Sequence, residues 1–284
     1  MLASVKEILN QAKEKKTAIG GFNISDLITA QAVVQAAEKT GLPAIVQITE
    51  KTMEFAGDFE IVALVKSIIE QRSGKIQIGI HLDHGRDFKL CKKAVRLGFN
   101  SVMIDGSNLS FEENKNLTKR VVDYLHKHKI TVQGELGTVP YLGRHQITSD
   151  DGEWDTYMTD PKQAVEFVRT TGIDSLAIGI GNSHGFQKEK DVPDWRRLKQ
   201  ISQNIDLPLI LHGASDWTSS KIKKAVKRGI SCFNVDTDIR VAYINNLCNF
   251  FEKGCNILDP RKVMAGIRDA IQKKVEEKML MFNC

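Results

Sequence analysis

Short apolar runs alternate with amphipathic segments along the whole chain. Eight of the runs are apolar at most positions, which is typical of parallel strands that are covered on both faces. We expect these strands at residues 18–23, 43–49, 76–81, 101–106, 131–137, 175–180, 207–212 and 230–236. The third run continues into Asp83 and His84.

The segments between these runs have helical spacing. For example, Val5, Ile8, Leu9 and Ala12 recur on one helical face. We expect helices at 2–16, 26–40, 59–72, around 91–95, 111–128, 160–170, 195–205 and 219–228, and over most of 238–284 with a break near 256–260. The alternation predicts an α/β fold, a (β/α)₈ TIM barrel with a helical C-terminal extension. A length of 284 residues suits one such domain over 1–284.

Three of the predicted strands deliver a histidine at their carboxyl end. These histidines are His84, His184 and His212, and a glycine follows each one. A single histidine at a strand end is more often structural, but the threefold repeat favours convergence, because active sites of this barrel lie at that end. Three imidazoles are typical ligands of a divalent metal, and they indicate catalytic zinc with an open coordination position.

Carboxylates accompany these histidines. Asp83 directly precedes His84, where it could act as general acid/base beside a metal that polarises a ketone. Its alternative role is to orient a ligand histidine. Asp105 and Glu135 end the next two strands, and the sequence leaves open whether they orient ligands or form another metal position.

The turns after the last two strands are suited to phosphate. Gly213-Ala214-Ser215 and Asn234-Val235-Asp236-Thr237 combine small residues, which expose backbone N–H groups, with hydroxyl donors. Loops after strands seven and eight of such barrels often bind phosphate.

Composition narrows the class of protein. The net charge of +5 is too mild and too dispersed to indicate a nucleic-acid partner. The five cysteines include no CxxC pair, which indicates free thiols in a reducing compartment. No apolar run reaches membrane-spanning length, and the charged N-terminus lacks the core of a signal peptide. We expect a cytoplasmic protein with no membrane partner.

Five motifs in this order resemble the class II, zinc-dependent fructose-bisphosphate and tagatose-bisphosphate aldolases. They are Leu82-Asp83-His84, Glu135-Leu136-Gly137, His184-Gly185, Leu211 to Ser215 and Asn234 to Thr237. The resemblance implies that His84, His184 and His212 bind zinc, that Asp83 is the proton donor and acceptor, and that Asp105 and Glu135 match a second or displaced metal position. It implies dihydroxyacetone phosphate binding by Gly185, Gly213, Ala214, Ser215, Asn234, Val235, Asp236 and Thr237.

The resemblance also implies partners. Members bind a monovalent cation (Na⁺ or K⁺) near the phosphate and form homodimers or homotetramers. An arginine of the neighbouring subunit can reach the distal phosphate, and Arg268 resembles it. The expected substrate is a small phosphorylated sugar.

Two regions depart from the family pattern. Relatives carry a Gly-Gly-Glu-Asp-like run after the fifth strand, whereas the loop 138–159 reads differently and brings its acids later, at Asp150, Asp151 and Glu153. One of these acids is the expected substitute for moving the α-carbon proton. Asp216-Trp217 and Arg86-Asp87 are also unusual.

We therefore expect a metal-dependent aldolase that cleaves a ketose (bis)phosphate to dihydroxyacetone phosphate and an aldehyde. The aldehyde is glyceraldehyde 3-phosphate or a less charged one, and the configuration at carbon 4 stays open. One alternative is another metal-dependent sugar-phosphate enzyme, although the first strand lacks the His-x-His of amidohydrolases. The other is a non-catalytic or partner-dependent barrel subunit.

Overall fold

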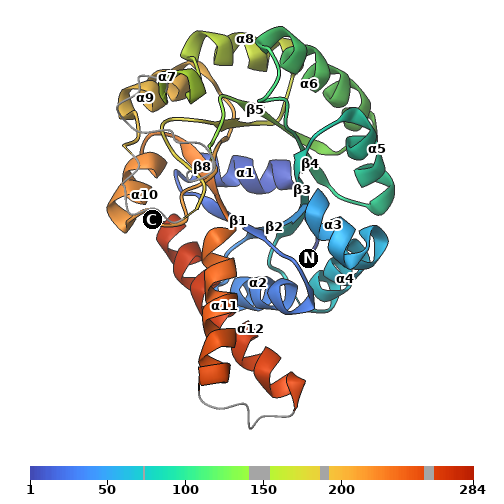
Figure 1. Ribbon diagram of the computed structural model, residues 1–284. Helices are drawn as coiled ribbons and strands as arrows, with labels where there is room; N and C mark the ends of the chain where they lie inside the picture. Colours follow the sequence, from blue (N-terminus) through green and yellow to red (C-terminus); the bar gives the residue numbers. More distant parts are fainter. Residues whose placement is uncertain (73, 141–153, 186–191, 253–258) are drawn as a thin grey trace.

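Eight parallel strands close into a barrel in sequence order, and helices surround it (Figure 1). The computed structural model describes residues 1–72, 74–140, 154–185, 192–252 and 259–284. The strands are β1 (Ile19–Asn23), β2 (Ala44–Thr49), β3 (Ile78–Gly85), β4 (Ser101–Ile104), β5 (Thr131–Leu136), β6 (Ser175–Ile178), β7 (Leu209–Leu211) and β8 (Ile230–Val235). The predicted TIM barrel is confirmed.

The helices occupy the segments between the strands. They are α1 (Val5–Glu14), α2 (Leu27–Thr40), α3 (Glu50–Ala56), α4 (Asp58–Arg72), α5 (Phe88–Leu97), α6 (Phe111–Leu125), the 3₁₀ helix η1 (His126–His128), α7 (Trp154–Tyr157), α8 (Pro161–Thr171), α9 (Trp195–Asn204), α10 (Ser219–Val226), α11 (Thr237–Glu252) and α12 (Pro260–Phe282). Capping side chains determine where several of these helices begin. Asp160, for instance, accepts hydrogen bonds from the backbone of Lys162 and Gln163 ahead of Pro161.

Two short helices lie where the sequence predicted none. Helix α3 begins directly after β2, where Thr49 caps it by accepting from the Thr52 N–H at 3.2 Å. Its seven residues bury only Met53, so it has too few turns to give a helical period. Helix α7 lies inside the segment 138–159, which was expected to be irregular throughout.

Helix α1 closes the amino-terminal end of the barrel (Figure 1). Val5, Ile8, Leu9 and Ala12 pack against inward-facing side chains of the strands in a cluster separate from the core around the barrel. The fit is close at Gly79, where an added Cβ would lie 2.3 Å from Val5 Cγ2. Polar side chains gather instead at the carboxyl end of the barrel.

Helices α11 and α12 lie side by side and extend away from the barrel as an arm (Figure 1). The C-terminal half of α12 returns to the barrel, where Phe282 stacks on Phe233 of β8 at 4.8 Å between ring centroids. Among the described residues, no helix combines the length and hydrophobicity needed to cross a bilayer.

Candidate metal and substrate site

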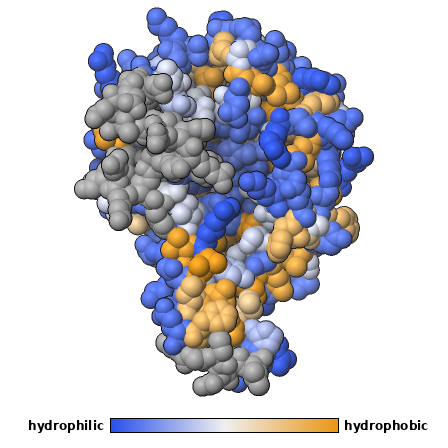
Figure 2. Space-filling model, viewed as in Figure 1, coloured by the Kyte–Doolittle hydropathy of each residue, from blue (hydrophilic) through white to orange (hydrophobic). Residues whose placement is uncertain are grey.

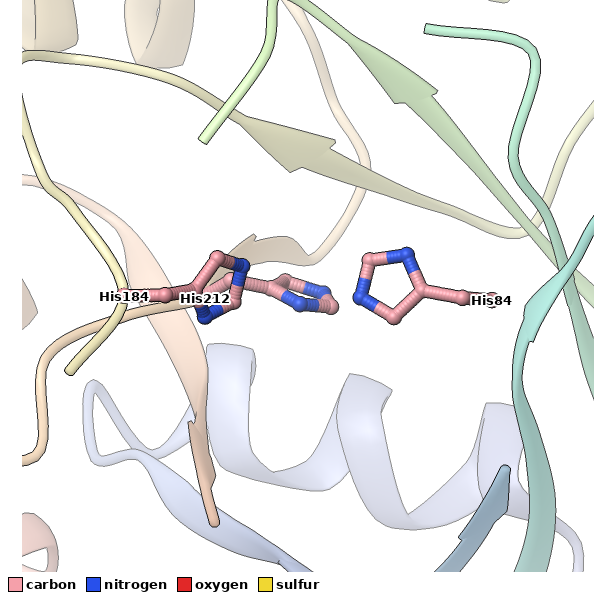
Figure 3. Close-up of side chains that lie close together, drawn as sticks. All are labelled: His84, His184 and His212. Carbon is pink, nitrogen blue, oxygen red and sulfur yellow. The ribbon is translucent and has the colours of Figure 1, made fainter. Parts of the chain in front are cut away.

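The three histidines predicted to meet do so at the carboxyl end of the barrel. Their rings point toward one another, with His84 on β3 facing the other two (Figure 3). Each offers a ring nitrogen, and these atoms lie within 4.8 Å of one another. The ring centroids are 4.9 Å apart for His84 and His212, 6.0 Å for His184 and His212, and 6.2 Å for His84 and His184.

A local distortion of β3 allows two consecutive residues to face this site. Neighbours on a regular strand point to opposite faces. Here the pairing of β3 with β4 shifts between Leu82 and Gly85, and His84 adopts a left-handed backbone with φ 52°. Such bulges redirect side chains near active sites. Asp83 and His84 therefore both reach the mouth of the barrel.

Asn23, at the end of β1, holds Asp83 in place. Its Nδ2 donates a 2.7 Å hydrogen bond to Asp83 Oδ2, and both side chains are buried. The other oxygen, Oδ1, has no hydrogen-bond partner and lies 3.8 Å from His84 Nε2. Sequence analysis missed Asn23, although a polar residue closing the apolar run of β1 was a usable signal.

Asp105 and Glu135 lie beside Nδ1 of His84, whereas Asp83 lies nearer to Nε2. Asp105 Oδ2 is 2.7 Å from His84 Nδ1, while its Oδ1 accepts from the Ser107 hydroxyl at 2.6 Å. Glu135 Oε2 is buried without a hydrogen-bond partner, 3.8 Å from the same nitrogen of His84. These three side chains form a second group that could hold a metal ion.

Burial and the clustered carboxylates push the three histidine pKa values apart. Burial lowers the pKa of His84, but the charges of Asp83 and Glu135 and the hydrogen bond to Asp105 outweigh it and raise the value to about 10. Burial, followed by the His84 charge, lowers the pKa of His184 to about 4 and that of His212 well below its usual range.

The pKa values of the buried carboxyl groups of Asp83 and Glu135 shift in opposite directions. Burial raises the pKa of Asp83, but the positive charge of His84, helped by the hydrogen bond from Asn23, outweighs it and lowers the value. Burial and the neighbouring Asp105 raise the pKa of Glu135 well above its usual range.

This arrangement fits a divalent cation. Two of the imidazoles are held neutral, as metal ligands must be, and Asp83 and Glu135 each present a buried oxygen without a hydrogen-bond donor. Three nitrogen donors facing an open mouth are the ligand set of catalytic zinc rather than of Mg²⁺ or Ca²⁺.

The two predicted phosphate segments lie next to each other, because β7 pairs with β8. Gly213 has φ 67°, and an added Cβ would lie 2.3 Å from the Ser183 carbonyl oxygen, so only glycine fits there. Ala214, Ser215 and Val235 are buried. The long helix α11 begins at Thr237, directly after β8, so its first turn lies beside these two segments.

Two members of these segments have partners within the chain. Asn234 is buried and places its Nδ2 2.9 Å from His212 Nε2. Asp236 accepts a 2.8 Å bond from Arg240 Nε. Gly185, beside His184, has φ 97° and open space where a Cβ would be.

The remaining expected site residues fall elsewhere. Arg268 lies on α12 and pairs with Asp269 at 3.0 Å, so the chain does not bring it to its own site. The predicted substitutes for the family acid, Asp150, Asp151 and Glu153, lie outside the described residues.

The unusual residues near the site have structural partners. Asp87 caps α5 by accepting from the Leu90 N–H at 2.7 Å, and Arg86 pairs with Glu50. Trp217 is buried and packs edge-on against Trp195 at 5.9 Å.

Fold and geometry together define a (β/α)₈ protein with a candidate metal site of three histidines at its catalytic end. A model of the family described as "Fructose-bisphosphate aldolase class-II" matches residues 3–284. The chain belongs to this family of zinc-dependent aldolases.

Individual relatives agree. The fructose-bisphosphate aldolase of Geobacillus stearothermophilus is 37% identical over 283 residues, covering 99% of this chain and 97% of that protein. That of Staphylococcus aureus strain N315 is 36% identical with the same coverage. Among solved structures, the YdjI aldolase of Escherichia coli K12 matches with a TM-score of 0.87 at 30% identity, covering 99% and 97% of the two chains.

Proposed function

We propose that this chain cleaves a ketose 1-phosphate or bisphosphate between carbons 3 and 4, giving dihydroxyacetone phosphate and an aldehyde. The observation that carries the proposal is the convergence of His84, His184 and His212 beside the buried carboxylate of Asp83. The choice between fructose and tagatose configuration is left to experiment, because it concerns one hydroxyl group.

We propose that the three histidines hold zinc through one ring nitrogen each. When bound, zinc supplies a Lewis acid for the ketone carbonyl. Asp105 fixes the ring of His84 through its 2.7 Å contact with Nδ1, as outer partners of ligand histidines do. Because Nδ1 is thereby engaged, Nε2 is the nitrogen of His84 that would bind the ion, and Glu135 lies 3.8 Å from Nδ1.

Asp83 would act as the general base in the cleavage direction. Its free Oδ1 takes the proton from the carbon 4 hydroxyl, which becomes the aldehyde carbonyl, while the electrons of the carbon–carbon bond pass to carbon 3. Carbon 3 then takes a proton from an acid, for which Asp150, Asp151 and Glu153 are the proposed sources. Asn23 keeps the Asp83 carboxylate aimed throughout.

The turn 213–215 and the start of α11 would hold the phosphate of the dihydroxyacetone half. Free N–H groups at a helix start favour an anion. Gly185, Asn234, Val235, Asp236 and Thr237 complete this proposed subsite. We further propose that a monovalent cation, Na⁺ or K⁺, binds near it.

We propose that the arm of α11 and α12 mediates assembly into a homodimer or homotetramer. Only Asp238 and Ile239 of the sixteen residues of α11 are buried. Ile244 and Phe251 are 54% and 60% exposed, and Figure 2 shows hydrophobic surface along the arm. In such an assembly Arg268 would face another subunit. A cytoplasmic location is part of the same proposal.

Metal content and product release would test the function directly. The purified protein should hold about one zinc per chain and release dihydroxyacetone phosphate from at least one of fructose 1,6-bisphosphate, tagatose 1,6-bisphosphate or a ketose monophosphate. A chelator should abolish release, and added zinc should restore it. Zinc-loaded protein that releases nothing from any of these substrates would contradict the proposal and favour the partner-dependent alternative.

A further inference from the structure

A lysine of α12 is buried beneath the two segments proposed to hold phosphate, residues 213–215 and the first turn of α11. Lys278 belongs to the last turns of α12 and is only 4% exposed. Its ammonium donates to the backbone carbonyl oxygen of Ser215 and lies 2.9 Å from Asp238 Oδ2. Because an unpaired buried charge is strongly unfavourable, these contacts determine the position of the ammonium.

The two partners of Lys278 come from the two segments proposed to hold phosphate. Ser215 ends the turn after β7, and Asp238 lies in the first turn of α11, directly after β8. The described pairing between β7 and β8 ends at Leu211 and Phe233, before Ser215 and Asp238 are reached. The ammonium therefore links the turn after β7 to the first turn of α11. We call this link the tie, and it sets the distance between the N–H groups of the two segments.

Charge gives the same lysine a second effect. The side chain of Asp238 is 8% exposed, so its carboxylate is poorly screened by water. A negative charge in the first turn of α11 competes with a phosphate for the positive end of the helix dipole. Pairing with Lys278 cancels that charge where a phosphate would otherwise be repelled.

We propose that Lys278 is a positioning residue for phosphate binding, acting through Ser215 and Asp238 without touching the substrate. The proposal rests on the proposed function in placing phosphate at these two segments. It implies that α12 contributes to substrate affinity from behind the site, in addition to its place in the arm.

The Lys278→Met variant tests this proposal. We expect the KM for the cleaved ketose phosphate and the inhibition constant of inorganic phosphate to rise together, by about 10- to 100-fold, as for a lost hydrogen-bonded charge. The kcat should stay near that of the wild type, because the lost interaction serves binding equally before and during the reaction. Zinc content should not change.

A double variant, Lys278→Met with Asp238→Asn, protects the test against misfolding. It removes the tie but leaves no unpaired buried carboxylate, so we expect it to fold and to show a smaller rise in both constants than the single variant. Lys273→Met is the matched control, since Lys273 is an exposed lysine of the same helix and should leave both constants unchanged.

Two outcomes would overturn the proposal. A folded double variant with the KM and phosphate inhibition constant of the wild type would show that the tie does not matter. Inorganic phosphate that neither inhibits nor thermally stabilises the wild type would show that the two segments bind no phosphate. Failure of the proposed function is distinguishable, because wild-type protein would then release no dihydroxyacetone phosphate, yet thermal shifts with inorganic phosphate would still compare the variants.

Discussion

The two ends of the barrel are built from the same strands but with opposite chemistry. At the amino-terminal end, inward-facing Ile45, Ile210 and Cys232 pack against α1 in an apolar cluster. At the carboxyl end, the same strands and their neighbours present histidines and carboxylates, and the buried oxygens Asp83 Oδ1 and Glu135 Oε2 lack hydrogen-bond partners. One end is packed as an apolar core, whereas the other contains buried polar groups without a hydrogen-bond partner.

This difference teaches that stability and catalysis are separable along each strand. On β3, Gly79 faces α1, and Asp83 faces the site four residues later. We expect substitutions at the amino-terminal end to lower the free energy of unfolding without changing chemistry. Those at the carboxyl end should impair chemistry with little loss of stability, or even a gain, because they remove unsatisfied polar groups.

The largest expected effect is that of Asp83→Ala. Loss of a general acid/base typically costs ~10²–10⁴-fold in rate, which steady-state release of dihydroxyacetone phosphate would measure. Because the substitution also removes the acceptor of the Asn23 Nδ2 hydrogen bond, kcat is compared per folded molecule. Asp206→Ala is the control, because this carboxylate is exposed and pairs with Lys13 at the other end of the barrel. Wild-type kcat in Asp83→Ala would refute the assigned role.

The opposite pattern is expected for Leu9→Ala in α1. Leu9 is 1% exposed in the apolar cluster between α1 and the strands, and truncating a buried leucine to alanine costs about 2–5 kcal/mol in unfolding free energy. Denaturant unfolding would measure the loss, while kcat per folded molecule should match the wild type. Glu14→Ala, on the exposed face of the same helix, should change neither quantity. If kcat fell in proportion to stability, the two ends would not be separable.

Sequence alone was sufficient to predict the fold and the convergence of the three histidines, for physical reasons. Buried parallel strands are apolar along their length, so a polar residue at the end of such a run stands out. That signal found Asp83, His84, His184 and His212, and it was also present at Asn23, where it was overlooked.

Other features had no local signal. The β3 bulge depends on pairing with β4, and the partners of Lys278 lie 63 and 40 residues away in the sequence. Arg268 shows the limit of motif resemblance, because its pairing with Asp269 within one chain does not reveal what another subunit would contact. Tertiary contacts decide these cases, and periodicity does not encode them.

A smaller effect at the carboxyl end is expected for Asp105→Ala. Removing the partner that fixes His84 Nδ1 should weaken zinc affinity by about 10- to 100-fold, as is usual for outer partners of ligand histidines. Competition with a chelator would measure this affinity. Ser107→Ala, which removes only the hydroxyl on the other oxygen of Asp105, should give a weaker loss. Equal affinities in wild type and Asp105→Ala would instead favour a role for Asp105 outside zinc binding.

The smallest expected effect returns to α1. Ser4 caps this helix by accepting from the Glu7 N–H, and removing such a cap costs about 1 kcal/mol. Ser4→Ala should therefore lower the unfolding free energy by that amount, whereas Ser4→Asp should retain it, because aspartate caps as well as serine. The diagnostic quantity is the zinc affinity, which should be equal in all three proteins. A cap loss that weakened zinc binding would mean that α1 transmits strain through the barrel interior to the histidines, and that the two ends are coupled.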